Sequence, residues 1–292
     1  MEPRLQAATK DFVQFTIFKN VKDKSMSKVI SPFPNLSELD FYGKVIQSIQ
    51  NAKLGAFDII IQSDEPDSAF SPPPKTGNKL VVFSFSDEKH RLPDYAADPD
   101  VLVVFKTYAP PEPNPKVCPI PLPYKNGFRP SLTPFESRRL NFFYSGHSNG
   151  GSRQELRKVS QTLLFPDSLI EFTSGFGQGL KTDEYARKLG GCKFAICPTG
   201  NSPETFRHTE AAMSGCIVIS NHQGAHWYNA DVPFIHVNSW TELPAIFDYL
   251  YYNKEACLQL HRDTLAYYDK YLSLEAVSGV CIKTIKHELS KK

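Results

Sequence analysis

The sequence predicts an α/β protein in which two doubly wound domains face a common cleft and helices follow at the C-terminus. Short, continuous apolar runs alternate with helical patterns, which is typical of parallel sheets covered on both faces. Between Tyr108 and Pro134 prolines interrupt this alternation, so the stretch is interpreted as an extended linker. We therefore expect domains at residues 1–134, linker included, and 135–292, with ligands at the carboxyl edges of the sheets.

The N-terminal half shows one helix and three strands. Ser37–Asn51 has the spacing of an amphipathic helix. Ala56–Gln62, Leu80–Phe85 and Val101–Phe105 are apolar runs of strand length, which favours buried strands of a parallel sheet.

Strands and helices alternate again after the linker. The predicted strands are Asn141–Ser145, Leu169–Thr173, Lys193–Cys197, Cys216–Ser220 and Pro233–His236. The predicted helices are Ser152–Leu164, Thr182–Leu189, Glu204–Met213 and Glu242–Tyr252. The segment Lys254–Ser290 is predicted to form two further helices.

Composition argues against several classes of function. The net charge of +2, from 33 basic and 31 acidic residues, gives no electrostatic footprint for nucleic acid. The apolar runs are too short to span a membrane, and the N-terminus MEPRLQAATKDF lacks an apolar signal core. The six cysteines form no CxxC pair, which indicates reduced thiols rather than disulfides or a zinc site. There is no HExxH motif, and the acidic runs Asp98-Pro99-Asp100 and Asp64-Glu65-Pro66-Asp67 lie in proline-containing loops that favour solvated turns, so we expect no metal site.

The most informative segment is Phe194–Ser220, FAICPTGNSPETFRHTEAAMSGCIVIS. A strand leads into a loop in which Ser202 suits a helix N-cap, with the helix starting near Glu204. The N–H groups at such a helix end attract a diphosphate, and Arg207 adds a guanidinium one turn later. Glu210 lies on roughly the same helix face and could accept hydrogen bonds from ribose hydroxyls. An ordinary capped crossover would show the same caps, so both interpretations stay open.

A second loop points to the same ligand. The segment Phe142–Arg153, FFYSGHSNGGSR, carries a glycine-rich turn that leads into a helix. Arg153 begins that helix, where a phosphate contact is favoured, and His147 lies in the turn, where it could touch a ligand or remain solvated.

Residues 197–220 resemble the signature of the exostosin family of glycosyltransferases. The family pattern reads C-P-x-G, then R-x-x-E-A, then G-C-I-P-V. The matching positions are Cys197, Pro198, Gly200, Arg207, Glu210, Ala211, Gly215, Cys216 and Ile217. The sequence departs from the pattern at Val218-Ile219, where the family has Pro-Val, and the resemblance covers about residues 140–242.

The resemblance implies a GT-B type fold of two Rossmann-like domains and a metal-independent, nucleotide-sugar-dependent transferase. No cofactor is implied, because the UDP-sugar is itself a substrate, with xylose as one of several family donors, and the glycan acceptor hydroxyl would be glycosylated with inversion. The candidate donor-binding residues are Gly146, His147, Arg153, Cys197, Pro198, Gly200, Asn201, Ser202, Glu204, Thr205, Arg207 and Glu210. The family's Golgi anchor is not seen in the sequence, so we expect a soluble or cytoplasmic protein.

An inverting transferase needs a general base near the acceptor hydroxyl. The first domain should supply it from a loop at the carboxyl edge of its sheet. Asp87 is the first carboxylate after the strand Leu80–Phe85 and is the predicted base, with Asp64 and Glu88 as alternatives. Lys106, Tyr108 and the run Lys89-His90-Arg91 are further residues that could line the acceptor side.

Two other functions were weighed. A non-catalytic relative that binds nucleotide sugar or glycan remains open, because the resemblance concentrates in the donor half. A dinucleotide oxidoreductase is disfavoured, because no GxGxxG motif follows a strand near the start of either half.

Overall fold

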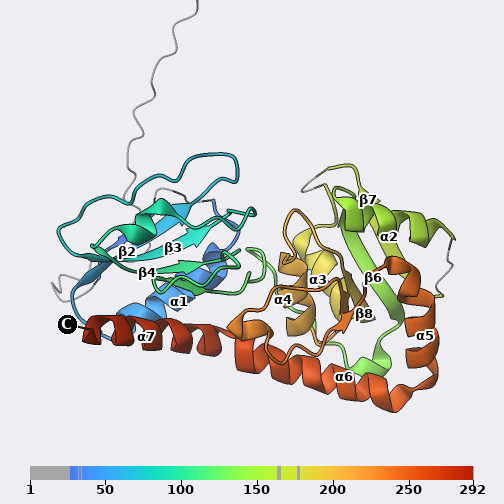
Figure 1. The fold of residues 1–292 in the computed structure, drawn as a ribbon. Helices are drawn as coiled ribbons and strands as arrows, with labels where there is room; N and C mark the ends of the chain where they lie inside the picture. Colours follow the sequence, from blue (N-terminus) through green and yellow to red (C-terminus); the bar gives the residue numbers. More distant parts are fainter. Residues whose placement is uncertain (1–26, 32, 34, 163–165, 176–177, 292) are drawn as a thin grey trace, which may run out of the picture.

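The structure, a computed structural model, describes residues 27–31, 33, 35–162, 166–175 and 178–291. It contains two five-stranded parallel sheets, with strand orders β1-β2-β3-β4-β5 and β10-β9-β8-β6-β7. The predicted α/β class with C-terminal helices is therefore confirmed. Figure 1 shows the two sheets side by side, joined by the loops that run between them.

The first sheet is built from the buried runs that the sequence predicted. Its strands are β1 (Val29–Ile30), β2 (Phe57–Ser63), β3 (Lys79–Phe85), β4 (Val101–Lys106) and β5 (Val117–Pro119), with helix α1 at Leu39–Asn51 and a 3₁₀ turn at Asp94–Ala97. The three predicted strands and the helix are confirmed to within two residues. The sequence analysis missed β1 and β5, because strands of two and three residues are too short to show a pattern.

The second sheet follows the predicted alternation. Its strands are β6 (Leu140–His147), β7 (Leu169–Thr173), β8 (Cys192–Cys197), β9 (Ile217–Ser220) and β10 (Ile235–His236). Its helices are α2 (Gly151–Thr162), α3 (Thr182–Gly190), α4 (Phe206–Met213) and α5 (Leu243–Tyr252), with 3₁₀ turns at Phe135–Ser137, Trp227–Asn229 and Trp240–Glu242. The predicted end of the second helix at Leu164 lies outside the described residues.

Both sheets bury side chains on both faces, as parallel strands require. In β3, Val81 and Phe83 lie in one apolar cluster, and Leu80 and Val82 lie in another on the opposite face. Each fully buried side chain of this size contributes about 1.5–3 kcal/mol to folding. The alternation of faces thus explains why these runs are apolar without interruption.

The last helix returns to the first sheet. After α6 (Lys254–Tyr267) and a π-helical turn at Tyr268–Leu272, α7 (Leu274–Ser290) contacts α1 and β4. Figure 1 shows α7 beneath the first sheet and α6 beneath the second. Residues 274–290, which the sequence analysis grouped with the second domain, therefore complete the core of the first.

The proline-rich segment is fixed between the two sheets by hydrogen bonds from both sides. Tyr42 Oη donates to the carbonyl of Pro121 at 2.5 Å, and Thr209 Oγ1 donates to that of Leu122 at 2.5 Å. The indole Nε1 of Trp227 donates to the carbonyl of Pro119 at 2.7 Å. The segment is thus an ordered connector that includes β5, rather than the extended linker of the prediction.

Candidate functional site

Two arginines lie close together at the carboxyl edge of the second sheet. Arg207, on α4, donates from Nη2 to the carbonyl of Ser145 at 2.9 Å, and its guanidinium carbon lies 4.7 Å from the centroid of the Tyr144 ring. Arg153 lies in the first turn of α2. Burial and the nearby charge of Arg207 lower the pKa of Arg153, because a neighbouring cation disfavours the charged form of the guanidinium.

Neither arginine has an acidic partner. Among the described residues, no carboxylate lies within 4.0 Å of the guanidinium of Arg153 or Arg207. The Nε atoms of both side chains are buried without a hydrogen-bond partner. Glu88 and Glu210 offset the two charges only from a distance. Two half-buried cations that form no ion pair are costly unless an anion joins them, so the arrangement suits a diphosphate.

Two glycines make room for the arginine side chains because they have no side chain of their own. A Cβ atom on Gly146 would lie 2.6 Å from Nη2 of Arg207, and one on Gly200 would lie 2.7 Å from Nη2 of Arg153. Gly150, with φ of +91°, approaches the carbonyl of Gly200, whose oxygen would lie 3.5 Å from an added Cβ. The predicted residues Gly146, Arg153, Gly200 and Arg207 are thus brought together.

Helix α4 begins later than predicted. Its N-cap is Thr205, whose backbone N–H donates to Nδ1 of His208 at 3.1 Å, so Ser202 is not the cap and Glu204 is not helical. The prediction failed because a histidine, rather than an acidic side chain, completes the capping box. Burial lowers the pKa of His208 to about 3, so the ring is neutral and its Nε2–H donates to Ser220 Oγ at 2.8 Å.

Three of the predicted donor-binding residues are buried. Cys197 and Pro198 are buried at the end of β8. Glu210 is 6% exposed and accepts a hydrogen bond from the backbone N–H of Lys125 at 3.1 Å, and burial raises its pKa. The geometry does not support the predicted ribose contact, because Glu210 holds the connector between the sheets. His147 is half-buried, and its carbonyl accepts from Tyr144 Oη at 3.0 Å.

The loop after β3 meets the loop after β8 across the boundary between the two sheets. Asn201 Nδ2 donates to Glu88 Oε2 at 2.6 Å, and Nε2 of His90 lies 2.8 Å from Ser202 Oγ. The charge of Glu88 also acts on Arg153, where it offsets part of the fall in pKa. The first sheet therefore supplies side chains next to the paired arginines.

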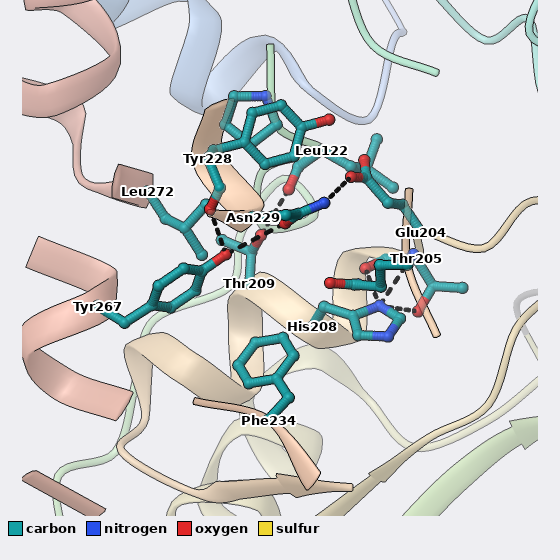
Figure 2. A pocket seen from close by; sticks show the side chains of 12 residues that line it. Leu122, Glu204, Thr205, His208, Thr209, Tyr228, Asn229, Phe234, Tyr267 and Leu272 are labelled. Atoms are coloured by element: carbon teal, nitrogen blue, oxygen red, sulfur yellow. Dashed lines mark hydrogen bonds between the residues drawn. The ribbon is translucent and has the colours of Figure 1, made fainter. Parts of the chain in front are cut away.

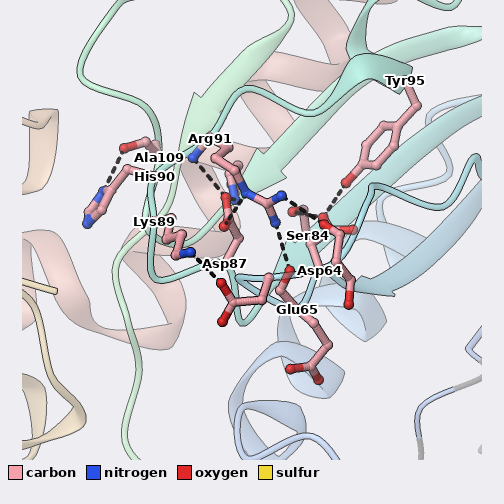
Figure 3. Close-up of polar contacts among 12 residues, drawn as sticks. Asp64, Glu65, Ser84, Asp87, Lys89, His90, Arg91, Tyr95 and Ala109 are labelled. Atoms are coloured by element: carbon pink, nitrogen blue, oxygen red, sulfur yellow. Dashed lines mark hydrogen bonds and ion pairs between the residues drawn. The ribbon is translucent and has the colours of Figure 1, made fainter. Parts of the chain in front are cut away.

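The predicted base Asp87 is placed elsewhere. Its side chain is fully buried, Oδ1 accepts from Arg91 Nε at 3.0 Å, and Oδ2 accepts from the Arg91 backbone N–H at 2.8 Å (Figure 3). Lys106, also fully buried, lies 3.2 Å from Oδ2. Burial acts to raise the pKa of Asp87, but Lys106 and Arg91 outweigh it and hold the pKa below its usual range. The geometry does not support Asp87 as the base, because an acceptor hydroxyl cannot reach it.

The alternative Asp64 belongs to the same interior network. Its Oδ2 accepts from Ser84 Oγ and from Tyr95 Oη, each at 2.6 Å, and only 4% of the residue is exposed (Figure 3). Burial raises its pKa. Of the three predicted carboxylates only Glu88 is partly exposed and in contact with the second sheet.

Glu204 lines a small polar cavity beneath the loop after β8. The cavity holds about 20 Å³, roughly one water molecule, and Tyr228, Asn229 and Tyr267 also line it (Figure 2). Burial raises the pKa of Glu204 to about 7, although Tyr228 and Asn229 beside it act in the opposite direction. Glu204 belongs to this loop, but its side chain is buried in the interior.

The sequence analysis named His90 and Tyr108 as residues that could line the acceptor side, but it missed Ser86 and Glu38 and did not predict the strained backbone of the first sheet's loops. Ser86, His90 and Tyr108 have φ of +72°, +56° and +50°, a region that disfavours non-glycine residues and is often found at functional sites. Glu38, which precedes α1, is 4% exposed, and burial raises its pKa to about 7. No local pattern predicts these features, because they depend on how the loops fold against one another.

Within the part of the chain that the structure describes, no group of three or more histidine, cysteine, aspartate or glutamate side chains could hold a metal ion. No described helix is both long and apolar enough to cross a bilayer. No family model matches the sequence, and no curated protein is significantly similar to it. The resemblance to the exostosin family therefore rests on the quoted residues alone.

Proposed function

We propose that this chain is a nucleotide-sugar-dependent glycosyltransferase of the GT-B type, with the diphosphate of the donor bound by Arg153 and Arg207. The observation that carries the proposal is the pair of neighbouring guanidiniums that form no ion pair with any described carboxylate and whose Nε atoms are buried without a hydrogen-bond partner. Two such groups can bind a diphosphate through several charge-assisted hydrogen bonds. The exostosin-like residues Gly200 and Arg207 lie in this same arrangement.

The proposed reaction moves a sugar, xylose or another UDP-linked sugar, to the hydroxyl of a glycan. The arginines stabilise the negative charge that grows on the diphosphate as it leaves, which is the task a metal ion performs in other transferases. The loops after β3 and β8 touch one another, so donor and acceptor must enter between Glu88 and Asn201 as these contacts open.

A non-catalytic binding protein is the second candidate. It is favoured by one observation, namely that Asp64 and Asp87 serve an interior network rather than a reaction. Such a protein would hold the nucleotide sugar through the same arginines and leave it intact.

Two measurements with the purified chain distinguish these functions. Calorimetric titration with UDP, with ADP as the comparison nucleotide, should give saturable binding that persists in excess EDTA. Incubation with UDP-xylose, UDP-glucuronic acid, UDP-galactose, UDP-arabinose and UDP-N-acetylglucosamine should release UDP from at least one donor. Binding without release would select the non-catalytic relative, and no binding of UDP would overturn both. Activity lost in EDTA and restored by manganese would contradict the metal-independent site.

A further inference from the structure

The side chain of His90 is held in the orientation of a proton acceptor. Its Nδ1 lies 3.0 Å from the carbonyl oxygen of Ala109, and a carbonyl can only accept, so Nδ1 carries a hydrogen. In the neutral ring Nε2 then has a free lone pair. Figure 3 shows the ring turned away from the Asp87 network.

The hydroxyl group of Ser202 lies within hydrogen-bond distance of this nitrogen. Ser202 Oγ, from the loop after β8, is 2.8 Å from Nε2 of His90, which is within the range for proton abstraction. Ser202 is 3% exposed and follows Gly200 and Asn201 in the same loop. The ring of His90 therefore meets a hydroxyl beside the arginines Arg153 and Arg207.

The backbone of His90 has a strained conformation. Its φ of +56° lies in the left-handed region, and its ring packs edge-on against Tyr108, whose φ is +50°. Each such residue costs about 1–3 kcal/mol and persists only when its surroundings hold it in place. The strained backbone of the loops after β3 and β4 thus directs the ring of His90 toward the second sheet.

We propose that His90 is the general base that accepts the proton of the attacking hydroxyl, with Ser202 Oγ occupying the place of that hydroxyl in the closed loops. The inference rests on the proposed transferase function. As the acceptor oxygen bonds to C1 of the sugar, the bond from C1 to the diphosphate oxygen breaks and its electron pair leaves with UDP. The acceptor O–H bond breaks, and its proton passes to Nε2 of His90 and later to solvent.

Three substitutions of His90 separate basicity from packing. His90→Asn keeps a donor for the Ala109 carbonyl and tolerates the positive φ, but removes Nε2. His90→Gln keeps an amide that can reach Ser202 but cannot take a proton. His90→Gly relieves the strain and leaves room for free imidazole. His287→Gln is the matched control, because it makes the same change at an exposed histidine of α7, outside the proposed site.

The experiment measures UDP affinity by calorimetry and UDP release from the active donor of the panel. We expect His90→Asn and His90→Gln to keep the UDP affinity within about threefold and to lose about a hundredfold to ten-thousandfold in turnover. Added imidazole should restore part of the turnover of His90→Gly, which it would not do for a merely structural residue. His287→Gln should keep the turnover of the wild type.

Several results would overturn the inference. Retained turnover in His90→Gln, with a loss in Glu88→Gln instead, would assign the base to Glu88. Failure of imidazole to rescue His90→Gly would reduce His90 to a structural role. If the wild type bound UDP but released none from the donors, the chain would be a binding protein and His90 would not act as a base. If the wild type did not bind UDP, the proposed function itself would be overturned.

Discussion

Arg153 occupies the space that Gly200 leaves by having no side chain, since a Cβ atom there would lie 2.7 Å from Nη2 of the arginine. This contact joins the start of α2 to the loop after β8. The absence of a Cβ atom at Gly200 therefore allows the guanidinium of Arg153 to take its position in the proposed diphosphate site.

Gly200→Ala should displace the Arg153 guanidinium and weaken UDP binding by about tenfold, or about 1.4 kcal/mol. The displaced atom is the end of a flexible side chain, so the free energy of unfolding should change by less than about 0.5 kcal/mol. Gly151→Ala is the control, because a Cβ atom there meets nothing within 4 Å. Titration calorimetry and urea unfolding check both statements, and equal UDP affinities in the two variants would refute the contact.

Arg153→Ala should weaken UDP binding by about 1.5–3 kcal/mol, which corresponds to about tenfold to a hundredfold. Removing one of two repelling cations should leave the unfolding free energy without ligand unchanged or slightly higher. Arg157→Ala, exposed on the same helix, should alter neither quantity. If Arg157→Ala weakened UDP binding as much as Arg153→Ala does, the effect would come from the loss of net positive charge rather than from a direct contact of Arg153 with UDP.

Glu204→Gln should stabilise the protein above pH 7. The folded pKa of about 7 exceeds the ordinary value of 4.5, so the folded state holds a proton that the unfolded state loses first. The stability from Glu204 is fully present below about pH 4.5 and is lost as the pH rises through 7. The amide removes this loss, and the gain at pH 8 should approach about 3 kcal/mol.

Urea unfolding of the wild type and Glu204→Gln at pH 5 and pH 8 measures this difference. The two proteins should differ much more at pH 8 than at pH 5. A constant difference across the two pH values would show that Glu204 does not hold its proton in the folded state.

Arg138→Ala should destabilise the protein by about 3 kcal/mol or more. The buried guanidinium donates to the carbonyls of Cys192, Ser214 and Gly215 at 2.9, 2.7 and 3.1 Å, and the substitution removes a donor from each of these acceptors. Arg139→Ala, at the exposed neighbour, should change the free energy of unfolding by less than about 0.5 kcal/mol. Similar denaturation midpoints for the two variants would contradict this role.

Apart from β1 and β5, the strands of both sheets could be predicted because each is an apolar run whose pattern is complete in itself. The start of α4 could not, because its cap depends on the unusual pairing of Thr205 with His208. Asp87 was the predicted base because it follows β3 directly, but sequence order does not show that Lys106 and Arg91 surround it. Arg153 and Arg207 were predicted to share a ligand, and the structure places them close enough to repel each other.

The return of α7 to α1 and β4 has a consequence for biosynthesis. Residues of α7 such as Val277 and Cys281 belong to the same apolar cluster as Val45 and Phe105. The ribosome makes α7 after the whole second sheet, so the first unit cannot close its interior while the second is still emerging. The core of the first unit is therefore completed only after α7 has emerged, and cleavage within the proline-rich connector would not yield an N-terminal fragment with a complete core.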